Sequence, residues 1–95
     1  MVGDYVIVRC KEAGVFAGTL HSEPGEKIVL TGARRIWYWE GAASLSQLSQ
    51  EGTSKPSACK FPCKMSSVYL TGVIEIIPTS DRARKSIEGV PVWRA

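Results

Sequence analysis

Apolar and polar residues alternate along much of the chain, which is the pattern of β-strands whose two faces meet different surroundings. On this basis we predict five strands. They cover Asp4–Cys10, Val15–Leu20, Lys27–Thr31, Arg34–Trp39 and Val68–Ile77. In the first strand, Val6, Val8 and Cys10 form the expected buried face. Gly32 is expected to end the third strand, and Gly72 is expected to form a bulge inside the last one.

Two short segments have the capping residues of helices. Ser44 followed by Gln47 fits a capping box, and Gly52 stands where that helix would end. The second helix is expected over about Ser80–Glu88, with Thr79 or Ser80 as its cap. These elements predict an α+β fold that is mainly β. We expect a curved antiparallel sheet of about five strands, or a small SH3-like, partly open barrel, with two short helices.

Composition and charge narrow the class of protein. The 95 residues suffice for one domain, residues 1–95, and 44% of them are hydrophobic, which argues against disorder. The net charge of +3 is too small for a protein that wraps nucleic acid. No apolar run approaches the roughly 20 residues that cross a bilayer, and the opening residues lack a secretion signal. Three cysteines then indicate reduced thiols and a cytosolic protein.

The segment Arg34–Trp39 contains the most informative residues. Strand alternation would place Arg35, Trp37 and Trp39 on one face and Arg34 with Tyr38 on the other. Either exposed face then presents an arginine beside an aromatic ring, a combination that suits flat anionic ligands and also protein hot spots. We predict all five as ligand- or partner-binding residues. The same pattern also fits a purely structural role or an oligomer interface.

Other chemistry is weakly indicated. Cys59 and Cys63, with Cys10 and His21, could form a zinc site, but the spacing is loose and loop thiols are the simpler interpretation. Lys55, Lys60 and Lys64 lie around Phe61 in an expected loop. Such a loop could contact phosphates, but solvated lysines are the simpler interpretation. No catalytic motif is found, so we expect a non-enzymatic protein without a cofactor or metal.

The stretch ARRIWYWEGAASLSQL resembles a family of small, uncharacterised bacteriophage and prophage proteins that is defined only as a domain of unknown function. Ala13–Leu20, Ile74–Pro78 and Val90–Trp93 match further segments of that family. The resemblance implies a phage accessory protein made in the cytoplasm of a bacterial host. It implies no catalytic residues.

These observations favour a phage-encoded binding protein, a host-takeover or counter-defence factor that sequesters an anionic, nucleotide-like ligand as a homo-oligomer. An alternative is an inhibitor that docks on a host protein, for example a CRISPR or other defence component, through its arginine and aromatic face. Nucleic-acid binding and a role in the virion stay open as further alternatives. No membrane partner is expected.

Overall fold

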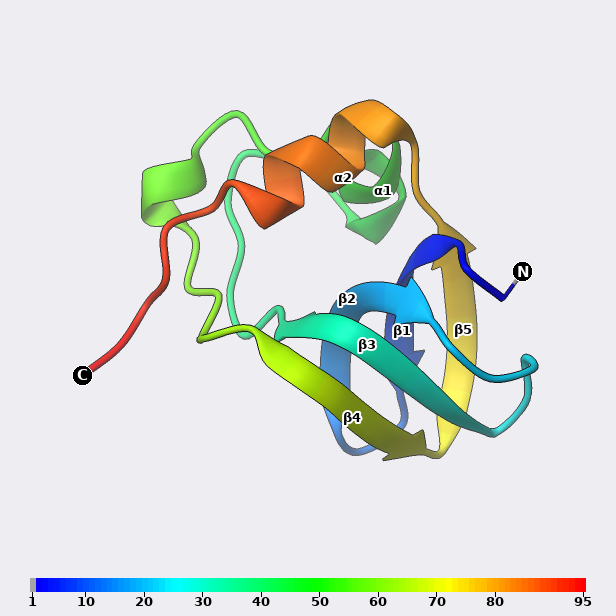
Figure 1. Cartoon of the computed structure of the whole chain (residues 1–95). Helices are drawn as coiled ribbons and strands as arrows, with labels where there is room; N and C mark the ends of the chain where they lie inside the picture. The colour runs from blue at the N-terminus through cyan, green and yellow to red at the C-terminus, as the bar shows by residue number, and fades with distance from the viewer. Residues whose placement is uncertain (1) are drawn as a thin grey trace.

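The computed structural model describes residues 2–95 and shows a curved sheet with two short helices packed over one of its faces (Figure 1). The regular elements, in chain order, are β1 (Tyr5–Cys10), β2 (Gly14–Leu20), β3 (Lys27–Arg35), α1 (Leu45–Glu51), β4 (Met65–Thr71), β5 (Val73–Pro78) and α2 (Asp81–Glu88). A short 3-10 helix spans Pro56–Ala58 in the connection between α1 and β4. The predicted fold class, a curved antiparallel sheet with two helices, is confirmed.

The sheet has the order β4-β3-β2-β1-β5, and every neighbouring pair is antiparallel. β4 and β5 therefore form its two edges, although Gly72 alone separates them in the chain. The prediction of one continuous strand over Val68–Ile77 was wrong, because this segment forms two strands at different edges of the sheet. Gly72 has a φ of +71°, which L side chains rarely adopt, so the chain bends sharply there and passes from one edge of the sheet to the other.

The predicted break at Gly32 was also wrong, because β3 continues through it. Gly32 has a φ of +54°, and the pairing register with β2 shifts between Ala17 and Thr19. One extra residue of β3 is thus accommodated as a bulge. β3 then ends at Arg35, and residues 36–39 form no strand beyond a single bridge at Tyr38. Strict alternation of faces therefore does not apply to the segment that we predicted as the fourth strand.

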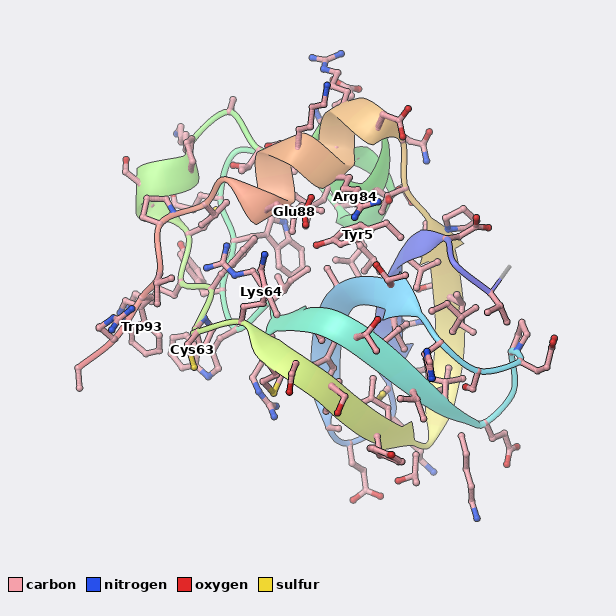
Figure 2. The ribbon with its side chains drawn as sticks, viewed as in Figure 1. Tyr5, Cys63, Lys64, Arg84, Glu88 and Trp93 are labelled. Atoms are coloured by element: carbon pink, nitrogen blue, oxygen red, sulfur yellow. The ribbon has the colours of Figure 1, made fainter. Side chains whose placement is uncertain are left out.

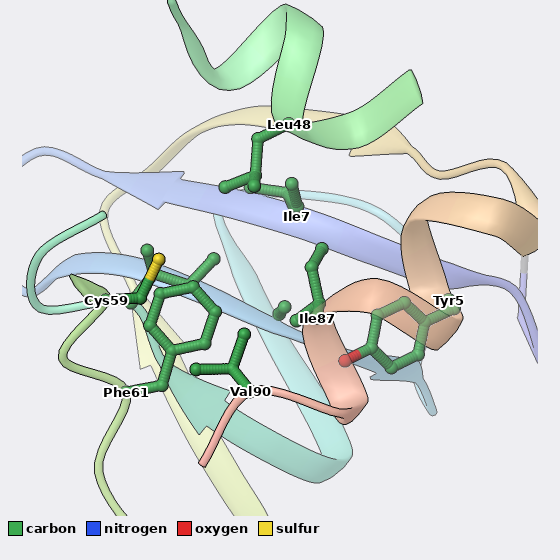
Figure 3. Packing of buried hydrophobic residues seen from close by; sticks show 9 residues of the cluster. Tyr5, Ile7, Leu48, Cys59, Phe61, Ile87 and Val90 are labelled. Carbon is green, nitrogen blue, oxygen red and sulfur yellow. The ribbon is translucent and has the colours of Figure 1, made fainter. Parts of the chain in front are cut away.

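Two clusters of buried side chains lie on opposite faces of the sheet. We call the one enclosed by the curve the inner cluster; it contains Val6, Val8, Cys10, Phe16, Leu20, Ile28, Leu30, Ala33 and Leu70. The helix cluster, under the two helices, contains Tyr5, Ile7, Ala17, Ile36, Leu48, Cys59, Phe61, Ile87 and Val90 (Figure 3). β1 contributes to both clusters, so our expectation of burial mainly on one face was wrong. A central strand covered on both sides is apolar at nearly every position.

The predicted helix ends are confirmed. The Ser44 hydroxyl accepts a hydrogen bond from the backbone N–H of Gln47, and the Gln47 side chain accepts one from the backbone N–H of Ala43. Ser80 caps α2 in the same way, through the N–H of Ala83. α1 ends at Gly52, whose φ is +78°.

Arg34, at the end of β3, is 2% exposed, and its guanidinium lies inside the protein. Its N–H groups donate to the carbonyls of Phe61, Pro62, Ile87 and Val90, at 2.7–3.4 Å. These five hydrogen bonds use all five donors of a guanidinium. Two of the acceptors, the carbonyls of Ile87 and Val90, lie at the end of α2, where the helix dipole is negative. Burial lowers the pKa of Arg34.

Arg34 therefore has no donor left for an external ligand. Our prediction that it binds a ligand or partner is corrected on this point. A guanidinium in this position joins the sheet, the loop before β4 and the end of α2.

We expect Arg34→Met to lower the free energy of unfolding by roughly 3–5 kcal/mol, because it leaves several buried carbonyls without donors. Urea denaturation measures this loss. Arg35→Met is the matched control and should cost about 1 kcal/mol, since Arg35 makes one backbone hydrogen bond and lies over the Phe16 ring. Equal losses in the two variants would show that Arg34 has no special role.

Tyr5 is the other unusual polar group in the interior. Its hydroxyl is buried and has no hydrogen-bond partner among the described residues. Burial, followed by the charge of Glu88, raises its pKa from 10.0 to about 12. Figure 2 shows Tyr5 under α2, near Arg84 and Glu88. The phenol is thus kept neutral in the folded protein at a pH where the unfolded chain ionises it.

The free energy of unfolding should therefore fall between about pH 10 and pH 12, by about 1.4 kcal/mol per pH unit from this group, because only the unfolded state loses the proton there. Tyr5→Phe should remove this contribution and cost little stability at neutral pH. Denaturation of both proteins across this range gives the difference. A constant difference between them would contradict the expected shift.

Candidate functional site

Three exposed aromatic side chains surround one lysine at the end of the sheet where β3 stops. Trp37 is 59% exposed, Trp93 43% and Tyr38 42%. The indoles of Trp37 and Trp93 are stacked, with centroids 5.1 Å apart and planes 11° from parallel. The ammonium of Lys60 lies 5.4 Å, 5.8 Å and 5.5 Å from the ring centroids of Trp37, Tyr38 and Trp93. We call these four residues the aromatic–lysine cluster.

Arg34 determines how these residues meet. Trp37 follows Arg34 by three positions in the chain. The carbonyls of Phe61 and Val90 accept hydrogen bonds from Arg34. Phe61 is the neighbour of Lys60 in the sequence, and Val90 precedes Trp93 by three residues. A single buried side chain thus fixes the chain close to each component of the cluster.

Backbone hydrogen bonds complete the arrangement. The N–H of Lys60 donates to the carbonyl of Tyr38 at 2.8 Å, and the N–H of Tyr38 donates to the carbonyl of Lys60 at 3.3 Å. The N–H of Trp93 donates to the carbonyl of Phe61 at 3.0 Å. The Tyr38 hydroxyl donates to a carboxylate oxygen of Glu40 at 2.7 Å, and this bond raises the pKa of Tyr38.

Lys60 is free to meet an anion. Within the described residues its ammonium makes no ion pair, whereas Lys64, four residues later, lies 3.9 Å from Glu88. Exposed indole faces beside an uncompensated ammonium are suited to a flat ring that carries negative charge.

Three of the predicted residues, Arg35, Trp37 and Trp39, line one hollow of about 190 Å³ beside the β1–β2 turn. Arg35 donates to the carbonyl of Ala13 at 2.9 Å, so part of its guanidinium is committed to the fold. The Trp39 indole N–H donates to Ala42, and its ring packs against the helix cluster. Trp39 therefore forms a wall of the hollow, and Trp37 connects the hollow to the aromatic–lysine cluster.

The structure thus brings Arg35, Trp37 and Trp39 together and places Tyr38 with Lys60. Sequence analysis missed Lys60 and Trp93 as site residues. Lys60 lies in a stretch without periodicity, and Trp93 is an apolar residue near the chain end with no predicted packing partner. Their proximity to Trp37 depends on tertiary contacts.

The described residues line other hollows as well. One of about 230 Å³ lies along β3 and β4 beside Lys27 and has a single ring, that of Tyr69, in its lining. A larger hollow of about 340 Å³ lies between the start of β1 and the start of α2, but it is lined by Asp4, Asp81 and Arg84 and has no exposed ring face. Within residues 2–95, no group of three or more His, Cys, Asp or Glu is placed to hold a metal ion. Cys10 and Cys59 are buried, and Cys63 is exposed. None of the helices in the described part of the chain has the length and apolar character needed to cross a bilayer.

Comparison with solved structures finds a similar fold in a heptameric archaeal Sm protein. The two chains align with a TM-score of 0.53 and 18% identity, over 83% of this chain and 90% of the other. At this identity the likeness shows the fold alone, and it supports the curved five-stranded sheet. No curated protein matches the chain.

A family model matches residues 3–87, which include the sheet, both helices and most of the candidate site. The expected membership in a domain of unknown function is therefore confirmed. The chain belongs to the family described as Domain of unknown function (DUF6948).

Proposed function

We propose that this chain is a non-enzymatic binding protein that holds a nucleotide-type anion on the aromatic–lysine cluster. The observation that carries the proposal is the exposed Trp37–Trp93 stack with the unpaired ammonium of Lys60 beside it. Stacking of a base on an aromatic side chain contributes about 1–3 kcal/mol, and the ammonium supplies a partner for phosphate. Arg35, at the hollow next to Trp37, adds a second positive charge.

The size of the hollow limits what it can hold. At about 190 Å³ it is smaller than typical small-molecule sites, which measure about 300–1,000 Å³. It fits a single ring, and the remainder of a larger ligand would lie across the exposed cluster. A mononucleotide, or one nucleotide unit of a larger ligand, fits this geometry better than a molecule that must be enclosed.

Calorimetry with cyclic nucleotides, ADP-ribose-type nucleotides and a short single-stranded oligonucleotide tests the proposal. We expect at least one of them to bind, with the affinity lowered about tenfold or more by Trp37→Ala. Val2→Ala changes an exposed apolar residue before β1, outside the cluster and the sheet edges, and is the control, which should bind like the wild type. Absence of binding across the panel, with no nucleotide absorbance carried through purification, would contradict the proposal.

The wider role that we propose is counter-defence in the cytoplasm of a bacterial host, by sequestering a nucleotide signal. Its support is the resemblance of the ARRIWYW segment to phage proteins. A bacterial protein that is captured by the wild type and lost on Trp37→Ala, in the absence of nucleotide binding, would instead favour an inhibitor of a host protein.

We further propose that the chain forms a homo-oligomer through its sheet edges. In the described chain the outer edges of β4 and β5 are unpaired, and each carries an exposed apolar residue, Tyr69 at 79% and Ile74 at 54%. β4 has no charged residue or proline, which are the usual protections of an open edge. Each copy has both a β4 edge and a β5 edge, so the β4 edge of one copy could pair with the β5 edge of the next. In a closed ring, every edge would then have its backbone hydrogen bonds made. The Sm protein of similar fold is heptameric.

Light scattering coupled to gel filtration should give a mass that is a multiple of the 10.4 kDa chain. Tyr69→Glu should reduce it to that of the monomer while the circular dichroism spectrum is retained, because a carboxylate would have to be buried at the edge. Glu23→Gln, a neutral change in the turn before β3, is the control and should keep the oligomer. A wild-type protein that is monomeric at all concentrations would overturn this part of the proposal.

A further inference from the structure

The two exposed indoles belong to segments that are held very differently. Trp37 lies two residues beyond the end of β3, beside the Tyr38–Lys60 pair of backbone hydrogen bonds. Trp93 lies in the tail after α2, where residues 91–95 are all exposed. Its backbone is attached to the body at Phe61, through a single β-bridge between Phe61 and Val92 in which the N–H of Trp93 donates to the Phe61 carbonyl. The tail runs away from the sheet and helices in Figure 1, and Trp93 lies at the outer side of the molecule in Figure 2.

The position of Lys60 relative to the two rings is informative. Its ammonium is almost equally far from the two centroids, 5.4 Å from that of Trp37 and 5.5 Å from that of Trp93. Parallel rings in contact lie about 3.5 Å apart, so an ammonium beyond the outer face of one indole would be much farther from the other. Lys60 therefore lies beside the stack, at the level between the rings.

We propose that Trp37 and Trp93 are the two jaws of a clamp that takes one nucleotide base between them. This inference rests on the proposed function and specifies how the ligand is held. Trp37 is the fixed jaw, and Trp93 is the movable one because its segment has few attachments. A base inserted between the indoles lies at the level of Lys60, so the phosphate on the ribose of the same nucleotide lies within reach of the ammonium. In the free protein the two jaws close on each other and shield their inner faces from water.

A clamp requires both rings, whereas stacking on a single face requires only one. Insertion of a base replaces one indole–indole contact by two indole–base contacts, so each ring contributes to affinity. Removing one ring loses one indole–base contact but also removes the indole–indole stack that the free protein must open. Removing both rings leaves the base no ring to stack on, so the double variant should lose more binding energy than the two single variants together. This lack of additivity distinguishes the clamp from two independent stacking sites.

Titration of the full chain with adenosine monophosphate, followed by calorimetry, tests the clamp. We expect Trp37→Ala and Trp93→Ala each to weaken binding about tenfold, and the double variant to weaken it by more than the product of the two single effects. Trp93→Phe keeps a ring and should retain most of the affinity. Lys60→Met should weaken binding of the monophosphate but not of adenosine, whereas Lys27→Met, at the opposite end of β3, should affect neither.

Circular dichroism supplies a second readout. The stacked indoles of the free protein should give an exciton couplet, which Trp93→Phe abolishes and which weakens on binding as the rings separate. A couplet of unchanged strength in the saturated complex would overturn the clamp.

The remaining outcomes separate the two proposals. Unchanged binding by Trp93→Ala would mean that a base stacks on Trp37 alone, and tighter binding would mean that Trp93 covers the site; either result overturns the clamp but leaves the proposed function standing. A wild-type protein that binds neither the monophosphate nor any nucleotide of the wider panel would overturn both.

Discussion

The buried guanidinium of Arg34 is the interaction on which the arrangement of this small protein depends. It connects the end of β3 with carbonyls of the loop before β4 and of the end of α2. A charge inside a protein is costly unless its hydrogen bonds are satisfied, and here every donor has an acceptor. The cost of burial thus becomes a source of specificity, since no other side chain presents five donors in this geometry.

The same interaction links the fold to the candidate site. The three chain segments that Arg34 joins carry Trp37, Lys60 and Trp93 within three residues of their attachment points. The buried Arg34 therefore positions the exposed aromatic–lysine cluster without being part of it. This division of roles explains why two adjacent arginines have different environments: Arg34 is enclosed, while Arg35 lies over the Phe16 ring at the edge of the hollow.

Local pattern was sufficient to predict what depends on near neighbours in the chain. Both helix caps and the first two strands follow from short-range hydrogen bonding and alternation, and they were predicted correctly. Glycine was harder to interpret, since Gly32 allows a bulge and Gly72 a sharp bend, and which occurs depends on strand pairing across the sheet. The pairing of Trp37 with Trp93 joins residues 56 positions apart, and the burial of Arg34 depends on carbonyls that only the folded chain supplies. Neither could be derived from periodicity.

The central claim is that the exposed indoles of Trp37 and Trp93, and not the buried Arg34, contact a nucleotide. The three tryptophans provide a direct test, because each gives its own indole N–H signal in a nitrogen–proton correlation spectrum and the Trp39 N–H is engaged by Ala42. On addition of adenosine monophosphate, the signals of Trp37 and Trp93 should move together and much more than that of Trp39. Shifts confined to Trp39, or to residues around the β4 edge, would contradict the account.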